Sequence, residues 1–127
     1  MDGSLTVDAV LNFDETRRRK FAVRDQKPSR ITEPEPGLTR QVLSHSATMM
    51  LVRHEMREGW RGAAHKHPQE QIVYVISGRL RITVGGVTFD ASAGDSLIVA
   101  SNVEHQASAL QASIVLDVFS PAREDYL

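Results

Sequence analysis

The sequence contains no cysteine, and this absence removes several kinds of chemistry at once. Disulfide bonds and thiolate nucleophiles are excluded, and any metal ion must be held by nitrogen or oxygen donors. No stretch approaches the roughly 20 apolar residues that a membrane-spanning helix needs. The N-terminus reads Met1-Asp2-Gly3-Ser4, which has an acidic residue where a signal peptide carries positive charge. These absences predict a cytoplasmic protein without a membrane segment.

Neither sign of charge dominates the chain. It has 15 Lys and Arg against 16 Asp and Glu, for a formal net charge of −1. A dedicated nucleic-acid-binding protein needs a dominant basic field, so the balance argues against that class. The basic run Arg17-Arg18-Arg19-Lys20 is interpreted as solvated surface. With 127 residues, 41% of them apolar, the chain is long enough to bury one core without staples.

Proline is concentrated in the N-terminal part, residues 1–37, which differs from the rest. The closely spaced Pro28, Pro34 and Pro36 disfavour a helix and predict a partly extended arm. Within the first twenty residues, Val7, Val10 and Leu11 recur at helical spacing and indicate a short helix. Residues 38–127 are predicted to form the folded domain.

From residue 38 the pattern changes to short apolar or alternating runs separated by turn residues. Gly85-Gly86, between two such runs, is typical of a tight hairpin. Many short strands without a convincing helix predict an all-β sandwich or barrel. The predicted strands are 39–43, 48–56, 71–76, 79–84, 87–89, 96–100 and 113–119.

The histidines suggest a metal site. Alternate side chains of a strand share a face, so His65 and His67 are expected to project together. Gln71 has the same parity at the start of the next strand, whereas Glu70 is expected to point the other way. His105, beyond the strand 96–100, is the natural fourth donor. The combination predicts one divalent metal ion. His45 and His54 lack partners at ligand spacing and are interpreted as structural.

These residues resemble the cupin family. Its first motif, G-x5-HxH-x3,4-E-x6-G, matches Gly59, His65, His67 and Gly78, with Gln71 at the glutamate position. Its second motif, G-x5-P-x-G-x2-H, matches at its ends but departs from the pattern at two inner positions. The resemblance implies a double-stranded β-helix, or jelly roll, with metal ligands at His65, His67, Gln71 and His105. The second motif falls on Gly94, Ala100 (for proline), Asn102 (for glycine) and His105.

Glutamine at position 71 changes the expected chemistry. A carboxylate would neutralise part of the metal charge, whereas a three-histidine, one-glutamine site leaves the full dipositive charge. Such a metal is a stronger Lewis acid and a better anchor for an anionic ligand. The donor set also differs from the two-histidine, one-carboxylate triad of oxygen-activating iron. Zinc, nickel, manganese and iron all accept it.

The C-terminal strand carries a carboxylate inside an apolar run. Asp117 lies within residues 113–119, where burial is costly unless the group is paired or functional. Phe119 shares its parity, and Arg123 follows just beyond the strand. One interpretation is a structural ion pair between Asp117 and Arg123. The other is a place for these residues in an active site.

The tail Asp-Val-Phe-Ser-Pro-x-Arg-Glu-Asp, together with His-x-His-Pro-x-Glu-Gln, resembles the pectin-degradation-type cupins. These proteins linearise 4,5-unsaturated monouronates to open-chain ketonic sugars. The resemblance implies catalytic or substrate-contacting roles for Asp117, Phe119 and Arg123, and a small anionic sugar as substrate. The alternatives are a metal-dependent dioxygenase or other cupin isomerase, and a non-catalytic sugar- or small-molecule-binding cupin.

A homodimer is expected from the strand that begins at Gln71. Its run Ile72-Val73-Tyr74-Val75-Ile76 carries apolar residues on both faces, so its outer face needs a cover. A second subunit and the N-terminal arm are the available covers.

Overall fold

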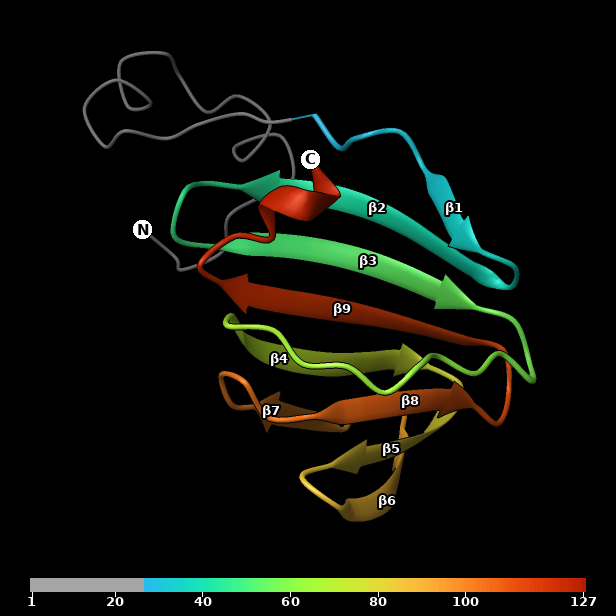
Figure 1. Ribbon diagram of the computed structural model, residues 1–127. Coiled ribbons are helices and arrows are strands. Elements are labelled where there is room, and N and C mark those ends of the chain that lie inside the picture. Colours follow the sequence, from blue (N-terminus) through green and yellow to red (C-terminus); the bar gives the residue numbers. More distant parts are fainter. Residues whose placement is uncertain (1–26) are drawn as a thin grey trace, which may run out of the picture.

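The computed structural model describes residues 27–127, which form nine strands and one short 3-10 turn (Figure 1). The predicted helix among the first twenty residues and the basic run at 17–20 lie outside this range. The elements are β1 (Thr32–Glu35), β2 (Leu38–His45), β3 (Met50–Met56), β4 (Glu70–Ser77), β5 (Arg79–Val84), β6 (Val87–Ser92), β7 (Ser96–Val99), β8 (His105–Ala109), β9 (Ser113–Ser120) and η1 (Glu124–Tyr126).

The strands form two antiparallel sheets, as the all-β prediction requires. The larger has six strands in the order β1-β2-β3-β9-β4-β7, and the smaller has three in the order β6-β5-β8. Strand β9 comes last in the chain but lies between β3 and β4, paired with both over most of its length. This return of the final strand to the middle of the larger sheet agrees with the expected jelly roll.

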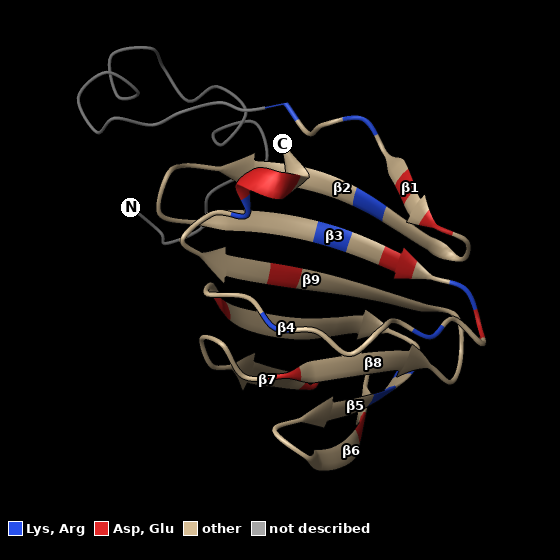
Figure 2. Cartoon of the chain, in the orientation of Figure 1, with Lys and Arg blue, Asp and Glu red and all other residues tan. Residues whose placement is uncertain are grey.

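Side chains alternate between the interior and the outside of the barrel. Along β4 exposed and buried residues alternate strictly from Glu70 to Ile76, and β9 alternates between buried and half-buried positions. Apolar residues fill most inward positions, for example Val75 and Leu80, which are 0% and 1% exposed. The one charged residue of β9 is Asp117, which faces inward with 4% exposure; Figure 2 shows a red band on this strand. The alternation of burial continues through this position, but the inward side chain there is a carboxylate instead of an apolar group.

The structure extends several predicted strands and adds two. Strand β8 was not predicted, because its sequence His-Gln-Ala-Ser-Ala has little apolar signal. Strand β1 lies inside the segment interpreted as an arm and pairs with β2. The predicted boundary at residue 37 thus falls in the turn of the β1–β2 hairpin, and the division into arm and barrel stays a prediction.

The residue types at two turns explain the backbone conformation of each turn. Gly85 and Gly86 both adopt positive φ, at +54° and +84°, which joins β5 to β6 as a two-residue hairpin. Asn102 stands where the cupin motif has a glycine and adopts φ +60°. Asparagine tolerates this left-handed conformation better than other residues with a Cβ, so the substitution leaves the approach to His105 intact.

Among residues 27–127, no helix is long and apolar enough to cross a membrane.

Candidate active site

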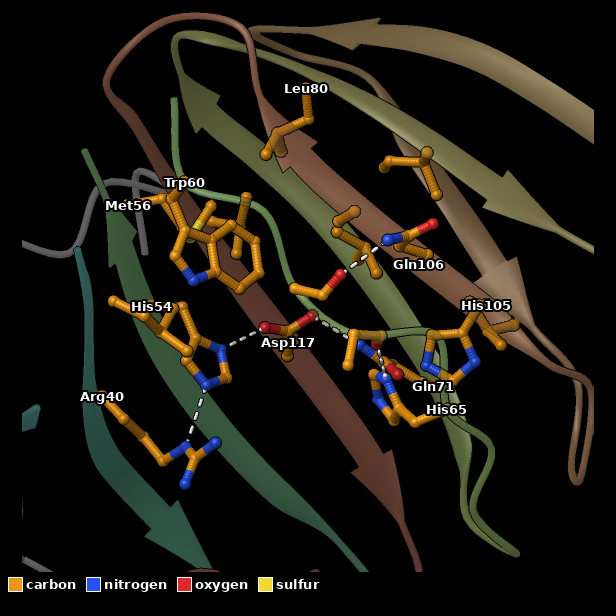
Figure 3. Close-up of a pocket in the computed structure, with 18 of the residues that line it drawn as sticks. Arg40, His54, Met56, Trp60, His65, Gln71, Leu80, His105, Gln106 and Asp117 are labelled. Carbon is orange, nitrogen blue, oxygen red and sulfur yellow. Dashed lines mark hydrogen bonds and ion pairs between the residues drawn. The ribbon is translucent and has the colours of Figure 1, made fainter. Parts of the chain in front are cut away.

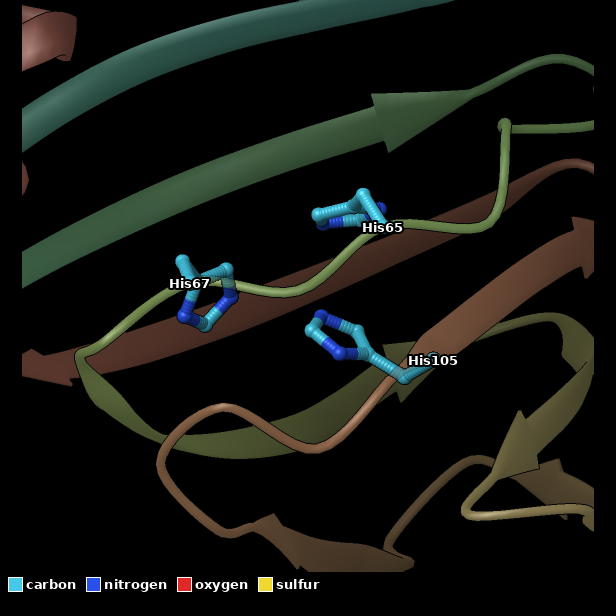
Figure 4. Close-up of side chains that lie close together, drawn as sticks. All are labelled: His65, His67 and His105. Atoms are coloured by element: carbon cyan, nitrogen blue, oxygen red, sulfur yellow. The ribbon is translucent and has the colours of Figure 1, made fainter.

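Three histidines come together, as Figure 4 shows; His67 and His105 are buried and His65 is exposed. His65 lies in the segment between β3 and β4, and its backbone exchanges hydrogen bonds of 3.0 and 2.8 Å with that of His105 at the start of β8. The backbone carbonyl of His67 accepts a hydrogen bond of 2.8 Å from the Asn102 amide. One ring nitrogen from each histidine lies within 4.8 Å of the others. The predicted pair and the distant histidine are therefore brought together.

Each imidazole is oriented by a backbone carbonyl. The Nδ1 atoms of His65, His67 and His105 lie 3.0, 2.9 and 2.8 Å from the carbonyl oxygens of Ala63, Gln69 and Val103. A carbonyl only accepts, so each Nδ1 carries a proton, and in a neutral ring the Nε2 then presents a lone pair. The Nε2 of His105 is buried and has no partner within residues 27–127.

These rings are also electrostatically suited to a cation. Burial, reinforced by the positive charge of Arg123, lowers the pKa of His67. Burial likewise lowers the pKa of His105, with smaller contributions from His65 and His67. Burial thus favours the neutral form of His67 and His105. Together with the clustering of the ring nitrogens and the unpartnered Nε2 of His105, this fits a divalent metal.

Gln71 brings an oxygen to the same place. It is the first inward residue of β4, and its Oε1 lies 3.1 Å from the Nε2 of His67. Its Nε2 donates a hydrogen bond of 2.8 Å to Asp117. Two acceptors, the lone-pair nitrogen of His67 and the amide oxygen of Gln71, therefore face each other. A bound cation would take both atoms as ligands and remove the repulsion between them. Glu70 is exposed, as its parity predicts.

Asp117 is bound to neighbours on both sides of β9. Its Oδ1 accepts from Gln71, and its Oδ2 lies 2.6 Å from the Nδ1 of His54 on β3. The ion pair with Arg123 that the sequence left open is wrong. Arg123 instead donates two hydrogen bonds to Asp125, at 3.1 and 2.8 Å. The buried carboxylate is thus satisfied by an imidazole and an amide.

Phe119 and Arg123 form one wall of the site. Phe119 is 1% exposed, and its ring centroid lies 5.7 Å from that of His67. The Arg123 guanidinium lies 5.3 Å from the Phe119 ring centroid and 4.3 Å from that of Tyr126. The Nη1 of Arg123 is buried without a partner in the described part of the chain, so a donor remains available there.

Most of these groups face one cavity of about 350 Å³, which Figure 3 shows with its hydrogen bonds. Its volume lies at the lower end of the roughly 300–1,000 Å³ typical of small-molecule sites. Of the seven predicted site residues, all but His67 line it, and His67 lies beside it in the histidine cluster. Apolar residues such as Val73, Leu80 and Val115 line the rest.

The sequence interpretation missed several cavity residues. His54, taken as structural, and Arg40 line the cavity and join the network around Asp117. Tyr126 in η1 also lines it, its ring edge-on to His54 at 6.1 Å between centroids. One available signal was parity: His54 alternates with Val52 and Met56, so its ring had to enter the core.

Comparisons with known proteins agree with the fold and the site. Residues 52–119 match the family model of the Cupin domain. The pectin degradation protein KdgF of Dickeya dadantii (strain 3937) is 30% identical over 111 residues, 86% of this chain and 99% of that protein. KdgF from Halomonas sp. superposes with a TM-score of 0.75 at 33% identity, covering 78% of this chain and 92% of that one. An RmlC-like cupin from Shewanella frigidimarina NCIMB 400 gives 0.75 at 37% identity, covering 77% and 88%.

In residues 27–127, nine strands around a histidine cluster form a cupin fold. The chain belongs to the cupin family. The resemblance to pectin-degradation-type cupins, first drawn from its motifs, is confirmed by the two KdgF proteins.

Proposed function

We propose that this protein is a metal-dependent enzyme that converts cyclic 4,5-unsaturated monouronates to linear ketonic sugars. The observation that carries the proposal is the place of Asp117. Its carboxylate faces the cavity of the three histidines and is joined to them through Gln71. Similarity to a pectin degradation protein over 86% of the chain supports this substrate class.

The reaction is an isomerisation, so no atom is gained or lost. A proton leaves the anomeric hydroxyl as the ring carbon–oxygen bond breaks, which leaves the ring oxygen as an enolate, and one proton then reaches the far carbon of that enolate to give the ketone. In this proposal Asp117 accepts the first proton and delivers the second, acting as general base and then as general acid. Each of its oxygens accepts one hydrogen bond in the structure, which leaves lone pairs free toward the cavity.

In this proposal, Phe119 and Arg123 bind the sugar. The substrate carries a carboxylate, and the buried Nη1 of Arg123 is a donor without a partner within residues 27–127. A charge-assisted hydrogen bond from Arg123 would fix the anionic end. Phe119, packed against His67, offers a flat apolar surface to the sugar ring.

The residues that would hold the metal are His65, His67, Gln71 and His105. When bound, a divalent ion supplies Lewis-acid polarisation of substrate oxygens. The side chains of the protein position the sugar around it and keep bulk water out of the buried part of the cavity.

The test uses the ultraviolet absorbance of the unsaturated uronate, which its conjugated enol-ether carboxylate produces. Freshly released substrate is mixed with the metal-loaded protein, with the chelator-treated protein, and with buffer. The proposal expects accelerated loss of absorbance only with the loaded protein. Loss at the buffer rate in all three would overturn it. Parallel oxygen measurements separate the dioxygenase alternative, which consumes oxygen, and tight binding without turnover would favour a binding cupin. The cytoplasmic location stays a prediction.

A further inference from the structure

A line of hydrogen bonds runs from Arg40 across the larger sheet to the histidine cluster. We propose that Arg40, acting through His54, holds the Asp117 carboxylate where it keeps the oxygen end of the Gln71 amide toward the metal. Arg40 and His54 are then positioning residues for the metal ligand set. The proposal rests on the ligand assignment made within the proposed function, and it goes beyond it by adding two residues outside the ligands.

The four residues lie on four neighbouring strands, one on each of β2, β3, β9 and β4. Arg40 is directly opposite His54 in the β2–β3 register. On β9, Asp117 is opposite Val52 of β3 and Val73 of β4, so His54 and Gln71 are its diagonal neighbours. Diagonal positions on one face lie within reach of long side chains. The three hydrogen bonds measure 3.0, 2.6 and 2.8 Å along this line.

The arginine fixes the direction of the two bonds that His54 makes. A guanidinium has only donors, so the His54 Nε2 that meets the Arg40 Nε must be an acceptor. An imidazolium or the other neutral tautomer would place two N–H groups against each other at 3.0 Å. His54 is therefore neutral with its proton on Nδ1, and it donates to Asp117.

The next hydrogen bond in the line joins Asp117 to Gln71, the proposed metal ligand. Asp117 accepts from His54 with one oxygen and faces the Gln71 amide with the other. The Asp117 oxygen that faces the amide at 2.8 Å acts as an acceptor, so it binds the NH2 end of that amide. The amide oxygen is left facing the His67 Nε2 at 3.1 Å. Without this constraint the amide could turn its NH2 group, which cannot ligate a metal, toward the histidines.

The closing experiment measures Zn²⁺ affinity by competition with a chromophoric chelator, starting from metal-free full-length protein. His54→Leu removes the donor to Asp117, and Arg40→Met removes the donor that fixes the tautomer. Both should weaken Zn²⁺ binding by about 10-fold or more, the usual range for partners of metal ligands. Arg40→Lys keeps a donor and should restore much of the affinity. Arg53→Gln, on the opposite face of β3, is the matched control and should bind as wild type.

A second readout needs neither metal nor turnover. Long-range proton–nitrogen NMR of the metal-free wild type should show His54 as the Nδ1–H tautomer, and Arg40→Met should shift that population. The Nε2–H tautomer in the wild type would overturn the proposal. So would wild-type Zn²⁺ affinity in both His54→Leu and Arg40→Met, or no Zn²⁺ binding by the wild type. Turnover enters neither measurement, so an enzyme that binds Zn²⁺ as described but leaves uronates unchanged would contradict the proposed function alone.

Discussion

The side chains of Asp117 and Gln71 are joined by a hydrogen bond of 2.8 Å, donated by the amide and accepted by the carboxylate. They lie on adjacent strands, β9 and β4, and both are buried in the same barrel. The contact connects the group proposed to move protons with a group proposed to hold the metal. A substitution at either position should therefore alter the hydrogen bonding of the other residue.

Asp117→Asn should abolish most of the turnover of an unsaturated uronate. The change nearly preserves shape but removes the ability to transfer a proton, so the rate should fall about 100-fold or more. Rates are compared at saturating metal, so that weakened metal binding does not count as lost chemistry. A fully active Asp117→Asn protein would contradict the proton-transfer role of Asp117, even if the metal site is intact.

Gln71→Glu should destabilise the metal-free protein near neutral pH. It replaces a donor to Asp117 with a second buried carboxylate, which leaves the acceptors of both groups facing each other. The expected loss in the free energy of unfolding is about 1–3 kcal/mol, the cost of an unsatisfied buried polar group. Denaturant unfolding with and without added metal measures it. Unchanged stability would show that the Asp117–Gln71 contact contributes little.

Metal-free protein should lose stability as the pH falls below about 6.5. Burial lowers the pKa of His67 and of His105 from the ordinary value of 6.5. As the pH falls, the unfolded chain therefore binds protons at a higher pH than the folded chain does. The stabilisation from these neutral rings is fully present above 6.5 and is lost as the pH falls toward their lowered folded values. Melting temperatures across this range check it, with His105→Gln expected to flatten the curve. A wild-type curve that is already flat would contradict the expectation.

The outer face of β4 and β7 leads us to propose a homodimer. Ile72, Tyr74 and Ile98 are 42%, 44% and 61% exposed, and Ile72 pairs directly with Ile98 across the two strands. Contiguous exposed apolar side chains mark association surfaces. Sedimentation should give twice the 14.1 kDa chain mass, and Ile72→Lys with Ile98→Lys should give one chain mass. A monomeric wild type at micromolar concentration would contradict the proposal.

Much of the fold was predictable, because alternation and turn residues are local signals. The strand Arg79–Val84 was predicted with the bounds that the structure has, and the inward parity of Gln71 followed from counting. Strand β8 escaped because it is short and polar. Its pairing with β5 depends on contacts between distant parts of the chain, which no local pattern encodes.

The network around Asp117 was harder to predict than the histidine cluster. The His-x-His spacing and the motif match predicted that His65, His67 and His105 lie close together. The partner of Asp117 depends on the register of β3 against β9, which places His54 diagonally beside it. Without that register, an ion pair with Arg123, the nearest cation in the sequence, stayed open as one of two interpretations. In the structure Arg123 turns to Asp125.

The most direct test of the account is a crystal structure of the metal-loaded protein with anomalous diffraction data collected at the metal's absorption edge. It should show one divalent ion bound by the Nε2 atoms of His65, His67 and His105 and by the Oε1 of Gln71. Donor distances should be about 2.0–2.3 Å, with open positions for water or substrate. An ion held by Glu70, or a Gln71 side chain turned away from the ion, would contradict the ligand set and the chemistry derived from it.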